Sequence, residues 1–420
     1  MSSWPLTAEP AVSVGGVRLT EIAERFGTPA CVLDEEHVRV RCREYVRAMA
    51  QNEVAYAAGA FWCRAMARWI AEEGLSLGAC SEGELVVARA AGFPGRDIVL
   101  HGSAKTAREL SAALDYGVGR VVIHAPSEVA QLAALAGQRQ KVLVGVTEGD
   151  AAAEVARRIV RQPALELVGV HCHVGPRSGR THCLEAVARR LVDFTAGLGG
   201  LPELHLGGGD AVPSRSGDRA LEIVAFARRL TSAVEQESAA RRIPVPRLTV
   251  GFGRAIVGLA GVTLYRVLSV KHGPRTSVVV DGDMCRGAQP APHGGRRDIV
   301  RIGHPAVSQT EPMTVVGRYC GAGDALAGEA LLPRDICAGD LLAVPCTGAG
   351  QLAMASSYHH VARPPVIAAR GGRAWPLIRR ETDEDLLRRD IGWPPALVSN
   401  RPPHVERPRA QPRHRHGSSH

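Results

Sequence analysis

The chain has 420 residues, of which 45% are hydrophobic and 22% are charged, a composition typical of a soluble globular protein with room for more than one core. Of its net charge of +9, residues 399–420 carry four, and the rest is spread along the chain without the basic stripe that nucleic-acid binding requires. Long apolar runs, signal-peptide order and paired CxxC cysteines are all absent from the sequence, so we expect a cytoplasmic protein that binds neither a membrane nor nucleic acid.

The first predicted elements surround a short buried strand at residues 54–61 (VAYAAGAF), which includes Gly59. Before it, residues 1–32 combine strand-like segments with a short helical stretch, and Asp34 is placed to cap the N-terminus of the next helix. We expect residues 1–32 to join a β domain that comes later in the chain.

Strands and helices then alternate. Strands are expected at residues 75–80, 98–100, 121–123, 141–146, 167–173, 204–206 and 248–250, each with a helical pattern after it. One of these helices begins at Ser81, where Glu84 completes a predicted capping box. Together with the first strand this makes eight strand-helix units, which predicts a (β/α)8 TIM barrel over residues 33–257.

After residue 261 the pattern changes to β-rich segments separated by Gly and Pro turns, at residues 262–270, 277–281, 313–316 and 340–345. We therefore expect an α/β protein in which the barrel is followed by an all-β barrel or sandwich domain over residues 258–398. Residues 399–420 (SNRPPHVERPRAQPRHRHGSSH) are rich in Arg, Pro and His, which predicts a disordered tail.

The C-terminal ends of the barrel strands are where such folds place their functional residues. Several of these ends carry glycine-rich turns, whose backbone N–H groups suit a phosphate, and an arginine adds a bidentate partner. They read HG at residues 101–102, HVG at 173–175, GGG at 207–209 and GR at 253–254.

The order of these motifs is similar to that of diaminopimelate decarboxylases. FGTP at residues 26–29, SEGEL at 81–85, HCHVG at 171–175, the triple glycine, Cys320 with Asp324, and MASSY at 354–358 follow one another as in that family. The resemblance covers about residues 20–393. It implies a fold-type III enzyme that depends on pyridoxal phosphate (PLP), related to ornithine and arginine decarboxylases, with a PLP-binding barrel, a β domain and active sites at a homodimer interface.

One part of the family's site is retained. The resemblance gives His173 the role of stacking on the pyridine ring and makes Tyr358 a further cofactor-binding residue. It implies that Cys320 and Asp324 reach into the neighbouring subunit's site. It assigns the phosphate cradle to Gly207, Gly208, Gly209, Gly253 and Arg254.

Another part is altered. Members of the family end the first strand in Tyr-Ala-x-Lys, where the lysine forms the Schiff base with PLP, and this chain has Gly59 there. The other replacements are Gly78 for Asp, Pro176 for Ser, Gly251 for the Glu that protonates the pyridine nitrogen, Gln289 for the substrate-binding Arg, Gly321 for Glu and Gly350 for a phosphate-binding Tyr. Glycine supplies neither the amine nor the acid, so these replacements predict PLP that is bound non-covalently or not at all.

These observations leave three functions open. In the favoured one, a diaminopimelate decarboxylase-like protein with a degenerate PLP site binds a small or phosphate-bearing molecule in the barrel mouth and is not a conventional decarboxylase. One alternative is an active PLP-dependent amino-acid decarboxylase, a carboxy-lyase, with unusual cofactor binding. The other is a pseudoenzyme that pairs with an active paralogue, so the assembly is expected to be a homodimer or such a heterodimer.

Few residues can replace the missing lysine. The chain contains only three lysines, and of these Lys105 alone follows a strand end at the barrel mouth, which makes it a candidate catalytic residue. Cys320 is a candidate nucleophile, but a structural cysteine is the favoured interpretation. His171 and His173 share a strand face and could bind a metal together with His101 or His205, but ring stacking by His173 is the favoured interpretation and no metal is expected.

Overall fold

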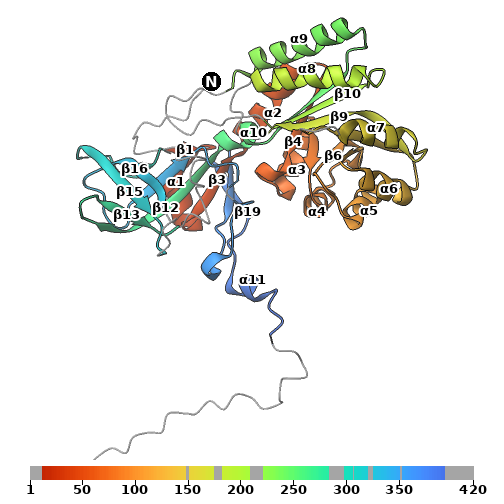
Figure 1. Cartoon of the computed structure of the whole chain (residues 1–420). Helices are drawn as coiled ribbons and strands as arrows, with labels where there is room; N and C mark the ends of the chain where they lie inside the picture. Colours follow the sequence, from red (N-terminus) through yellow and green to blue (C-terminus); the bar gives the residue numbers. More distant parts are fainter. Residues whose placement is uncertain are drawn as a thin grey trace, which may run out of the picture. The chain divides into compact units, whose positions relative to one another are not determined.

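The computed structural model describes residues 12–147, 151–174, 182–208, 221–282, 298–305, 307–319, 325–350 and 352–392 (Figure 1). The chain divides into one compact unit that runs through Arg380 and a second that begins at Glu381 and contains the short helix α11 (Asp383–Leu387). The tail predicted at residues 399–420 lies outside the described residues. No helix in the described part of the chain is long and apolar enough to cross a membrane.

Eight parallel strands close into a barrel, in the order β10-β11-β4-β5-β6-β7-β8-β9. Their bounds are β4 (Glu53–Ala57), β5 (Ser76–Ala79), β6 (Ile98–Leu100), β7 (Arg120–Ile123), β8 (Gln140–Gly145), β9 (Leu165–Val174), β10 (Glu203–Gly208) and β11 (Arg247–Phe252). The predicted (β/α)8 barrel is thereby confirmed.

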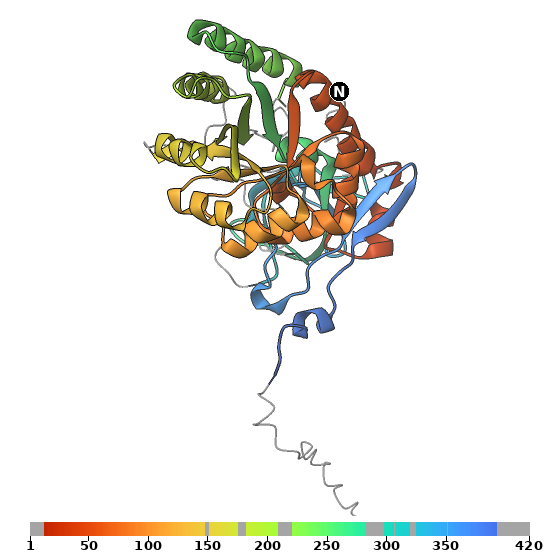
Figure 2. The ribbon, with the colours of Figure 1, turned by 90° about the vertical axis from the view of Figure 1, so that its right-hand side faces the viewer.

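The helices of the barrel lie outside its strands (Figure 2). They are α2 (Glu35–Met49), α3 (Arg64–Glu72), α4 (Glu82–Ala91), α5 (Ala107–Tyr116), α6 (Pro126–Leu135), α7 (Ala151–Val160), α8 (His182–Ala196), α9 (Ile223–Arg241) and the single turn α10 (Arg254–Val257). Local chemistry sets several of their starts: as predicted, Asp34 caps α2 by accepting a hydrogen bond from the N–H of His37 at 2.9 Å.

The predicted capping box at Ser81 is half formed. The Ser81 hydroxyl accepts the N–H of Glu84, but the Glu84 carboxylate accepts the N–H of Cys80, at 2.7 Å, instead of that of Ser81. The Glu84 side chain therefore reaches one residue further back toward the end of β5 than a capping box requires.

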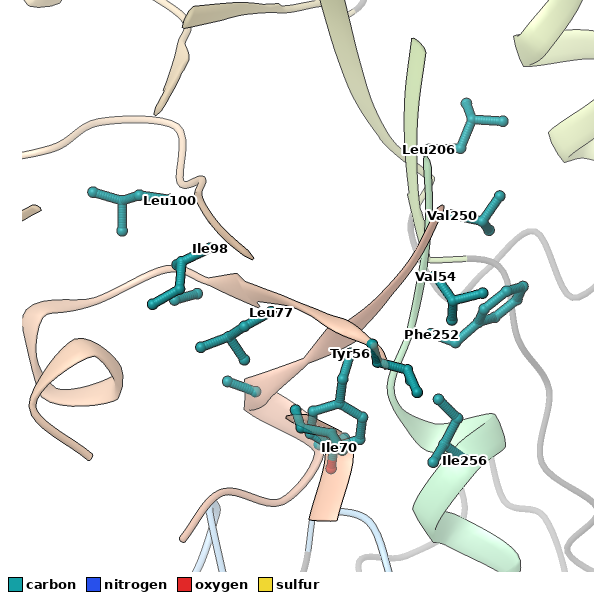
Figure 3. Packing of buried hydrophobic residues seen from close by; sticks show 14 of the residues in the cluster. Val54, Tyr56, Ile70, Leu77, Ile98, Leu100, Leu206, Val250, Phe252 and Ile256 are labelled. Carbon is teal, nitrogen blue, oxygen red and sulfur yellow. The ribbon is translucent and has the colours of Figure 1, made fainter. Parts of the chain in front are cut away.

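Alternation along each strand separates an outer core from the barrel interior. Val54 and Tyr56 of β4 point toward the helices, where Tyr56 is fully buried and donates a hydrogen bond to the carbonyl of Phe61 (Figure 3). Ala55 and Ala57 consequently face the interior, because successive side chains of a strand point to opposite faces. Toward the C-terminal end of the barrel, the first strand thus presents only small side chains to the inside.

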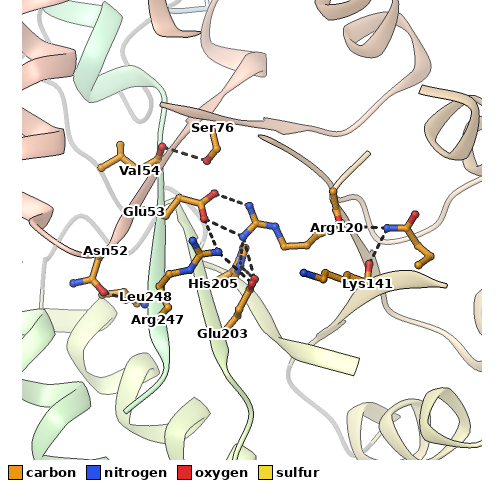
Figure 4. Close-up of polar contacts among 12 residues, drawn as sticks. Asn52, Glu53, Val54, Ser76, Arg120, Lys141, Glu203, His205, Arg247 and Leu248 are labelled. Atoms are coloured by element: carbon orange, nitrogen blue, oxygen red, sulfur yellow. Dashed lines mark hydrogen bonds and ion pairs between the residues drawn. The ribbon is translucent and has the colours of Figure 1, made fainter. Parts of the chain in front are cut away.

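The N-terminal end of the barrel is closed by ion pairs (Figure 4). Arg120 of β7 is buried and reaches Glu53 of β4 at 2.7 Å and Glu203 of β10 at 3.0 Å, and Arg247 of β11 pairs with both carboxylates from the surface. A hollow of about 1340 Å³ at this end of the barrel is lined in part by the same paired residues. Since the strand ends with the predicted site residues are at the opposite end, this hollow is separate from the candidate site.

The described residues of the second domain form a nine-stranded mixed sheet. Its main order is β16-β15-β13-β12-β3-β18-β19, while β17 pairs with β12 and β14 pairs with β17. The strands are β3 (Ala30–Asp34), β12 (Gly261–Lys271), β13 (Ser277–Val280), β14 (Val300–Ile302), β15 (Thr310–Val316), β16 (Ala325–Pro333), β17 (Leu341–Pro345), β18 (Val366–Arg370) and β19 (Arg373–Ile378).

An N-terminal strand lies inside this sheet. β3 pairs antiparallel with β12 and parallel with β18, and the small elements β1 (Ser13–Val14), β2 (Val17–Arg18) and α1 (Leu19–Phe26) precede it. The boundary predicted between residues 32 and 33 falls within β3, and the domain limits themselves stay a prediction.

Candidate active site at the barrel mouth

Gly59 lies in a short 3-10 turn (Ala58–Ala60) that directly follows β4, and it is exposed. A Cβ atom built at this position would have one neighbour within 4 Å, the Oε1 atom of Glu84 at 4.0 Å. The backbone of Gly59 is not in the left-handed region, so neither space nor conformation requires glycine here. A side chain of any length would start at the rim of the barrel.

The sheet domain contacts this same turn. The N–H of Gly350 donates a hydrogen bond of 2.7 Å to the carbonyl of Ala60, the residue after Gly59. Gly350 has a φ of +81°, and the nearest neighbour of a Cβ built there would be the Sδ atom of Met354 at 4.0 Å. Two of the predicted replacements by glycine, at positions 59 and 350, therefore lie next to each other.

Gly207 and Gly208 end β10 in a turn that requires glycine. A Cβ on Gly208 would meet the carbonyl oxygen of Val174 at 2.0 Å, and its φ of +85° is in the left-handed region. A Cβ on Gly207 would lie 2.8 Å from Nδ1 of His173, so the imidazole rests against the bare backbone of β10. The structure thus brings His173, Gly207 and Gly208 together, while Gly209 lies outside the described residues. The phosphate cradle assigned to the glycines and the ring-stacking role assigned to His173 stay predictions.

Gly253 and Arg254 follow β11 at the same rim. A Cβ on Gly253 would come within 2.9 Å of the Cβ of Ala60 and 3.1 Å of the Cβ of Ala57, so this glycine allows the end of β11 to pack against the end of β4. Arg254 is half-buried, and its charge acts on His173.

Histidines occupy the inner wall just below the rim. The rings of His101, after β6, and His171, on β9, are stacked with centroids 5.7 Å apart and an interplanar angle of 19°. Burial, reinforced by the charge of His173, lowers the pKa of His101 to about 4. Burial and then the charge of His101 hold the pKa of His171 well below its usual value. These imidazoles are therefore neutral at neutral pH.

His173 and His205 follow the same trend. Burial and then the charge of Arg254 lower the pKa of His173, and burial lowers that of His205 against the opposing effect of Glu203. The described residues contain no group of three or more His, Cys, Asp or Glu side chains that could hold a metal ion.

A small cavity of about 50 Å³ lies between these histidines and the glycine turns. Its described lining contains no lysine, arginine, aspartate or glutamate. The lining residues are Ala55, Ala57, Gly78, Val99, His101, His171, His173, His205, Leu206, Gly207, Gly208, Thr249 and Gly251.

Lys105 does not face this cavity. Its Nζ atom is 2.8 Å from Oε1 of Glu128 and donates to the carbonyl of Gly102 at 3.0 Å, and its side chain is 1% exposed. Its predicted catalytic role stays untested, but this pairing favours a structural role.

Tyr358 is also apart from the cavity. It is 61% exposed, and its ring contacts that of His359 at a centroid distance of 4.1 Å. Cys320, Asp324, Gln289, Pro176 and Gly321 lie outside the described residues, so the roles predicted for them stay predictions.

Two residues of the site were missed in the sequence. Thr249 is 2% exposed and lines the cavity from β11, two residues before Gly251 on the same face of the strand. Glu84 approaches Gly59 from α4. The sequence signal that could have identified Thr249 is its spacing of two residues from Gly251, because residues two apart on a strand lie on the same face of the sheet.

The closed parallel barrel, with glycine turns at its C-terminal strand ends and a mixed sheet domain beside them, is the architecture of pyridoxal-dependent decarboxylases. The pyridoxal binding domain of that family matches residues 35–157, and its C-terminal sheet domain matches residues 122–348. The chain belongs to the diaminopimelate decarboxylase family within this class.

Two relatives and one solved structure illustrate the similarity. A diaminopimelate decarboxylase of Actinosynnema pretiosum subsp. auranticum is 47% identical, with 92% of this chain and 95% of that protein covered. The diaminopimelate decarboxylase of Mycobacterium bovis is 36% identical, with 90% and 95% covered. The crystal structure of diaminopimelate decarboxylase from M. jannaschii has the same fold, with a TM-score of 0.87 at 23% identity over 93% of this chain and 98% of that one.

The described residues fit PLP only in part. Gly207 and Gly208 leave bare backbone beside His173, and the charge of Arg254 acts on His173, so a phosphate at this rim would meet backbone and a cation. At the positions that the resemblance assigns to the aldehyde and the ring nitrogen, Gly59 and Gly251 offer no side chain. These residues therefore support no reaction step through a covalently held pyridoxal.

Proposed function

We propose that the barrel mouth binds a small phosphate-bearing molecule such as PLP without a covalent bond, and that the chain does not catalyse conventional decarboxylation of an amino acid. The observation that carries this proposal is Gly59, which stands at the end of β4 with open space where a lysine side chain would begin. Without that amine the carbonyl of PLP has no protein partner for a Schiff base.

None of the three lysines compensates for Gly59. Lys105 is held by Glu128, Lys141 lies near the start of β8 at the N-terminal end of the barrel, and Lys271 ends β12 in the sheet domain. The absence of a carboxylate from the described lining of the cavity supports the proposal further, because a neutral pyridine is a poor electron sink.

Binding and covalent attachment can be measured separately on the purified full-length protein. PLP binding is followed by equilibrium dialysis, and attachment by absorption in the visible range and by intact mass after borohydride reduction. We expect saturable binding with no reducible band and no gain in mass. A reduced adduct on any lysine would contradict non-covalent binding. The absence of saturable binding would show that PLP is not a ligand of this protein.

The rim arginine gives a matched pair of variants. Arg254→Gln should weaken PLP binding about tenfold or more, because a charge-assisted hydrogen bond to phosphate is lost. Arg247→Gln, at the opposite end of the barrel, should leave PLP binding unchanged. Equal effects of the two substitutions would argue against a phosphate site at the rim.

The alternative, an active PLP-dependent amino-acid decarboxylase, is favoured by one observation, the 47% identity to an enzyme named diaminopimelate decarboxylase over nearly the whole chain. Release of carbon dioxide from diaminopimelate by the protein with PLP measures it directly. Turnover above that of PLP alone would establish this function in place of the one we favour.

The assembly belongs to the same proposal. A cytoplasmic homodimer, or a heterodimer with an active paralogue, is consistent with membership of the family, although Cys320 and Asp324, on which the dimer prediction rests, are not among the described residues. Light scattering on the purified chain and co-purification from its native host distinguish a monomer, a homodimer and a mixed dimer.

A further inference from the structure

The residues that line the cavity at the barrel mouth lie in layers, each made of residues paired in register across neighbouring strands; we call these layers levels. His205 of β10 is paired in register with His171 of β9 on one side and with Thr249 of β11 on the other. Two residues further along, Gly207 is paired with His173 and with Gly251 in the same way. A polar level formed by three neighbouring strands therefore lies directly below a level in which two of the three residues are glycine.

Two polar atoms of the lower level have no hydrogen-bond partner among the described residues. They are Nδ1 of His171 and Oγ1 of Thr249, on side chains that belong to residues 7% and 2% exposed. Leaving such groups unpaired in a protein interior is unfavourable, so buried polar atoms normally have a partner. Since both atoms belong to residues that line the cavity, the missing partner is expected to occupy the cavity itself.

The glycines create the space for that partner. A Cβ on Gly251 would find its nearest neighbours at 3.5 and 3.6 Å, and a Cβ on Gly78 would lie 3.4 Å from Nε2 of His101, so both positions accept a side chain that would enter the cavity. The cavity volume of about 50 Å³ corresponds to roughly three or four non-hydrogen atoms, since one water-sized probe takes about 10–15 Å³.

The surrounding charges select the kind of occupant. The groups that face His171 are His101 from β6, His124 beyond β7, His205 from β10 and His173 on its own strand. Arg254 acts on His173, and Lys105 acts on His101 and His124 while paired with Glu128. A cation would meet no carboxylate in the described lining, whereas an oxygen anion would find imidazole N–H groups and a hydroxyl as donors.

We infer that this cavity is a binding site for a small monocarboxylate, of the size of formate or acetate, held between Thr249 and the imidazole of His171. Its two oxygens supply the acceptors that the hydroxyl and the ring N–H lack. The inferred site lies in the lower part of the same cavity whose mouth the proposed function assigns to a phosphate-bearing molecule. It does not rest on that function, because its test uses no PLP and its outcome is independent of whether PLP binds.

The experiment uses the full-length protein with sodium formate, and with sodium chloride at equal ionic strength as the reference. Thermal unfolding should shift to higher temperature with formate in a saturable way, and less or not at all with chloride. Thr249→Val keeps the shape of the side chain but removes the hydroxyl. We expect it to raise the melting temperature of the ligand-free protein by a few degrees and to abolish the formate shift.

Thr249→Ser is the matched control, because it keeps the hydroxyl and should keep the formate shift. Gly251→Val tests the same site without touching the polar atoms: its side chain fills the cavity, and it should also abolish the shift. A result from Thr249→Val or Gly251→Val is used only if that variant unfolds cooperatively. If one of these two variants fails to fold, the other decides whether the site exists.

The pH dependence separates this site from general salt effects. A carboxylate next to neutral imidazoles favours their protonation, so formate should bind with proton uptake and with an affinity that rises from about pH 7.5 to about pH 5.5, where formate is still ionised. Equal shifts with formate and chloride, or a formate shift that persists in both Thr249→Val and Gly251→Val, would overturn the inference and leave water as the occupant.

Discussion

The ammonium group of Lys105 and the carboxylate of Glu128 form a buried ion pair, with 2.8 Å between Nζ and Oε1. The same carboxylate accepts hydrogen bonds from the backbone N–H groups of Lys105, His124 and Ala125. The pair therefore joins the loop after β6 to the start of α6. A lysine held in this way is a structural part of the barrel wall.

Removing the lysine should cost stability and leave cofactor chemistry unchanged. Lys105→Ala leaves Glu128 buried without its counter-ion, so the free energy of unfolding should fall by about 3–5 kcal/mol, measured by urea titration. Lys141→Ala, at an exposed position, should change it by less than about 0.5 kcal/mol. If Lys105→Ala instead abolished a borohydride-reducible PLP adduct, Lys105 would be the covalent partner and our interpretation of the ion pair would be wrong.

Restoring the amine at position 59 should restore covalent attachment. Gly59 has open space around a built Cβ, and Glu84 is near enough to pair with an ammonium group. Gly59→Lys should therefore fold normally and, with PLP, give a visible absorption band and a borohydride-stable gain in mass. Gly59→Met, of similar length but without the amine, should give neither. A folded Gly59→Lys protein that binds PLP without forming the adduct would show that more than the lysine is missing.

The ion pairs at the N-terminal end of the barrel should differ sharply in their contribution to stability. Arg120 is buried between Glu53 and Glu203, so Arg120→Met should reduce the free energy of unfolding by about 3–5 kcal/mol. Arg247 contacts the same carboxylates from a side chain that is 48% exposed, and Arg247→Met should cost at most about 1 kcal/mol. Similar costs would mean that burial does not determine the strength of this network.

Acid should destabilise the protein through the histidines of the barrel interior. The pKa of His101 is about 4 in the folded protein and about 6.5 when unfolded, so the unfolded state binds the proton first. The stability that depends on the neutral ring is present above about pH 6.5 and is lost as the pH falls toward 4. In His101→Gln this loss should be smaller by on the order of 3 kcal/mol between these two pH values.

Urea titrations at several pH values measure this difference. His272→Gln, at an exposed position in the sheet domain, is the control and should keep the pH profile of the unchanged protein. The carboxylates add to the same trend at lower pH. Burial acts to raise the pKa of Glu203, but the hydrogen bond with His205 and the charge of Arg120 lower it to about 2. A profile unaffected by His101→Gln would exclude this histidine as a source of acid lability.

Most of the barrel could be predicted from the sequence because its signals are local. Apolar runs of strand length alternate with helical spacing, and Asp34 caps α2 as its position predicts. The sheet domain was less predictable. β14, β16, β18 and β19 were not expected. The insertion of β3 between β12 and β18 depends on pairings between distant parts of the chain, which no local pattern encodes.

The candidate site divides in the same way. The place of Gly59 at the end of β4 followed from the strand pattern, whereas its proximity to Gly350 depends on the contact between two domains. Thr249 was missed because threonine is common in strands and carries no sign of its own that it faces a cavity. Lys105 was placed at the mouth by its position after β6, but the carboxylate that holds it is on a helix of the next strand-helix unit.

The interior of the barrel has two unlike sides. Val99, Val122, Leu143 and Val168 form a buried apolar cluster on β6, β7, β8 and the first half of β9, while His171, His205 and Thr249 form the polar level across the end of β9, β10 and β11. Of the apolar cluster, Val99 lines the cavity at the barrel mouth, so the cavity wall combines an apolar side chain of this cluster with the hydrogen-bonding groups of the polar level. Such a wall fixes the orientation of an amphiphilic ligand, because the apolar part and the hydrogen-bonding part of the ligand contact different residues.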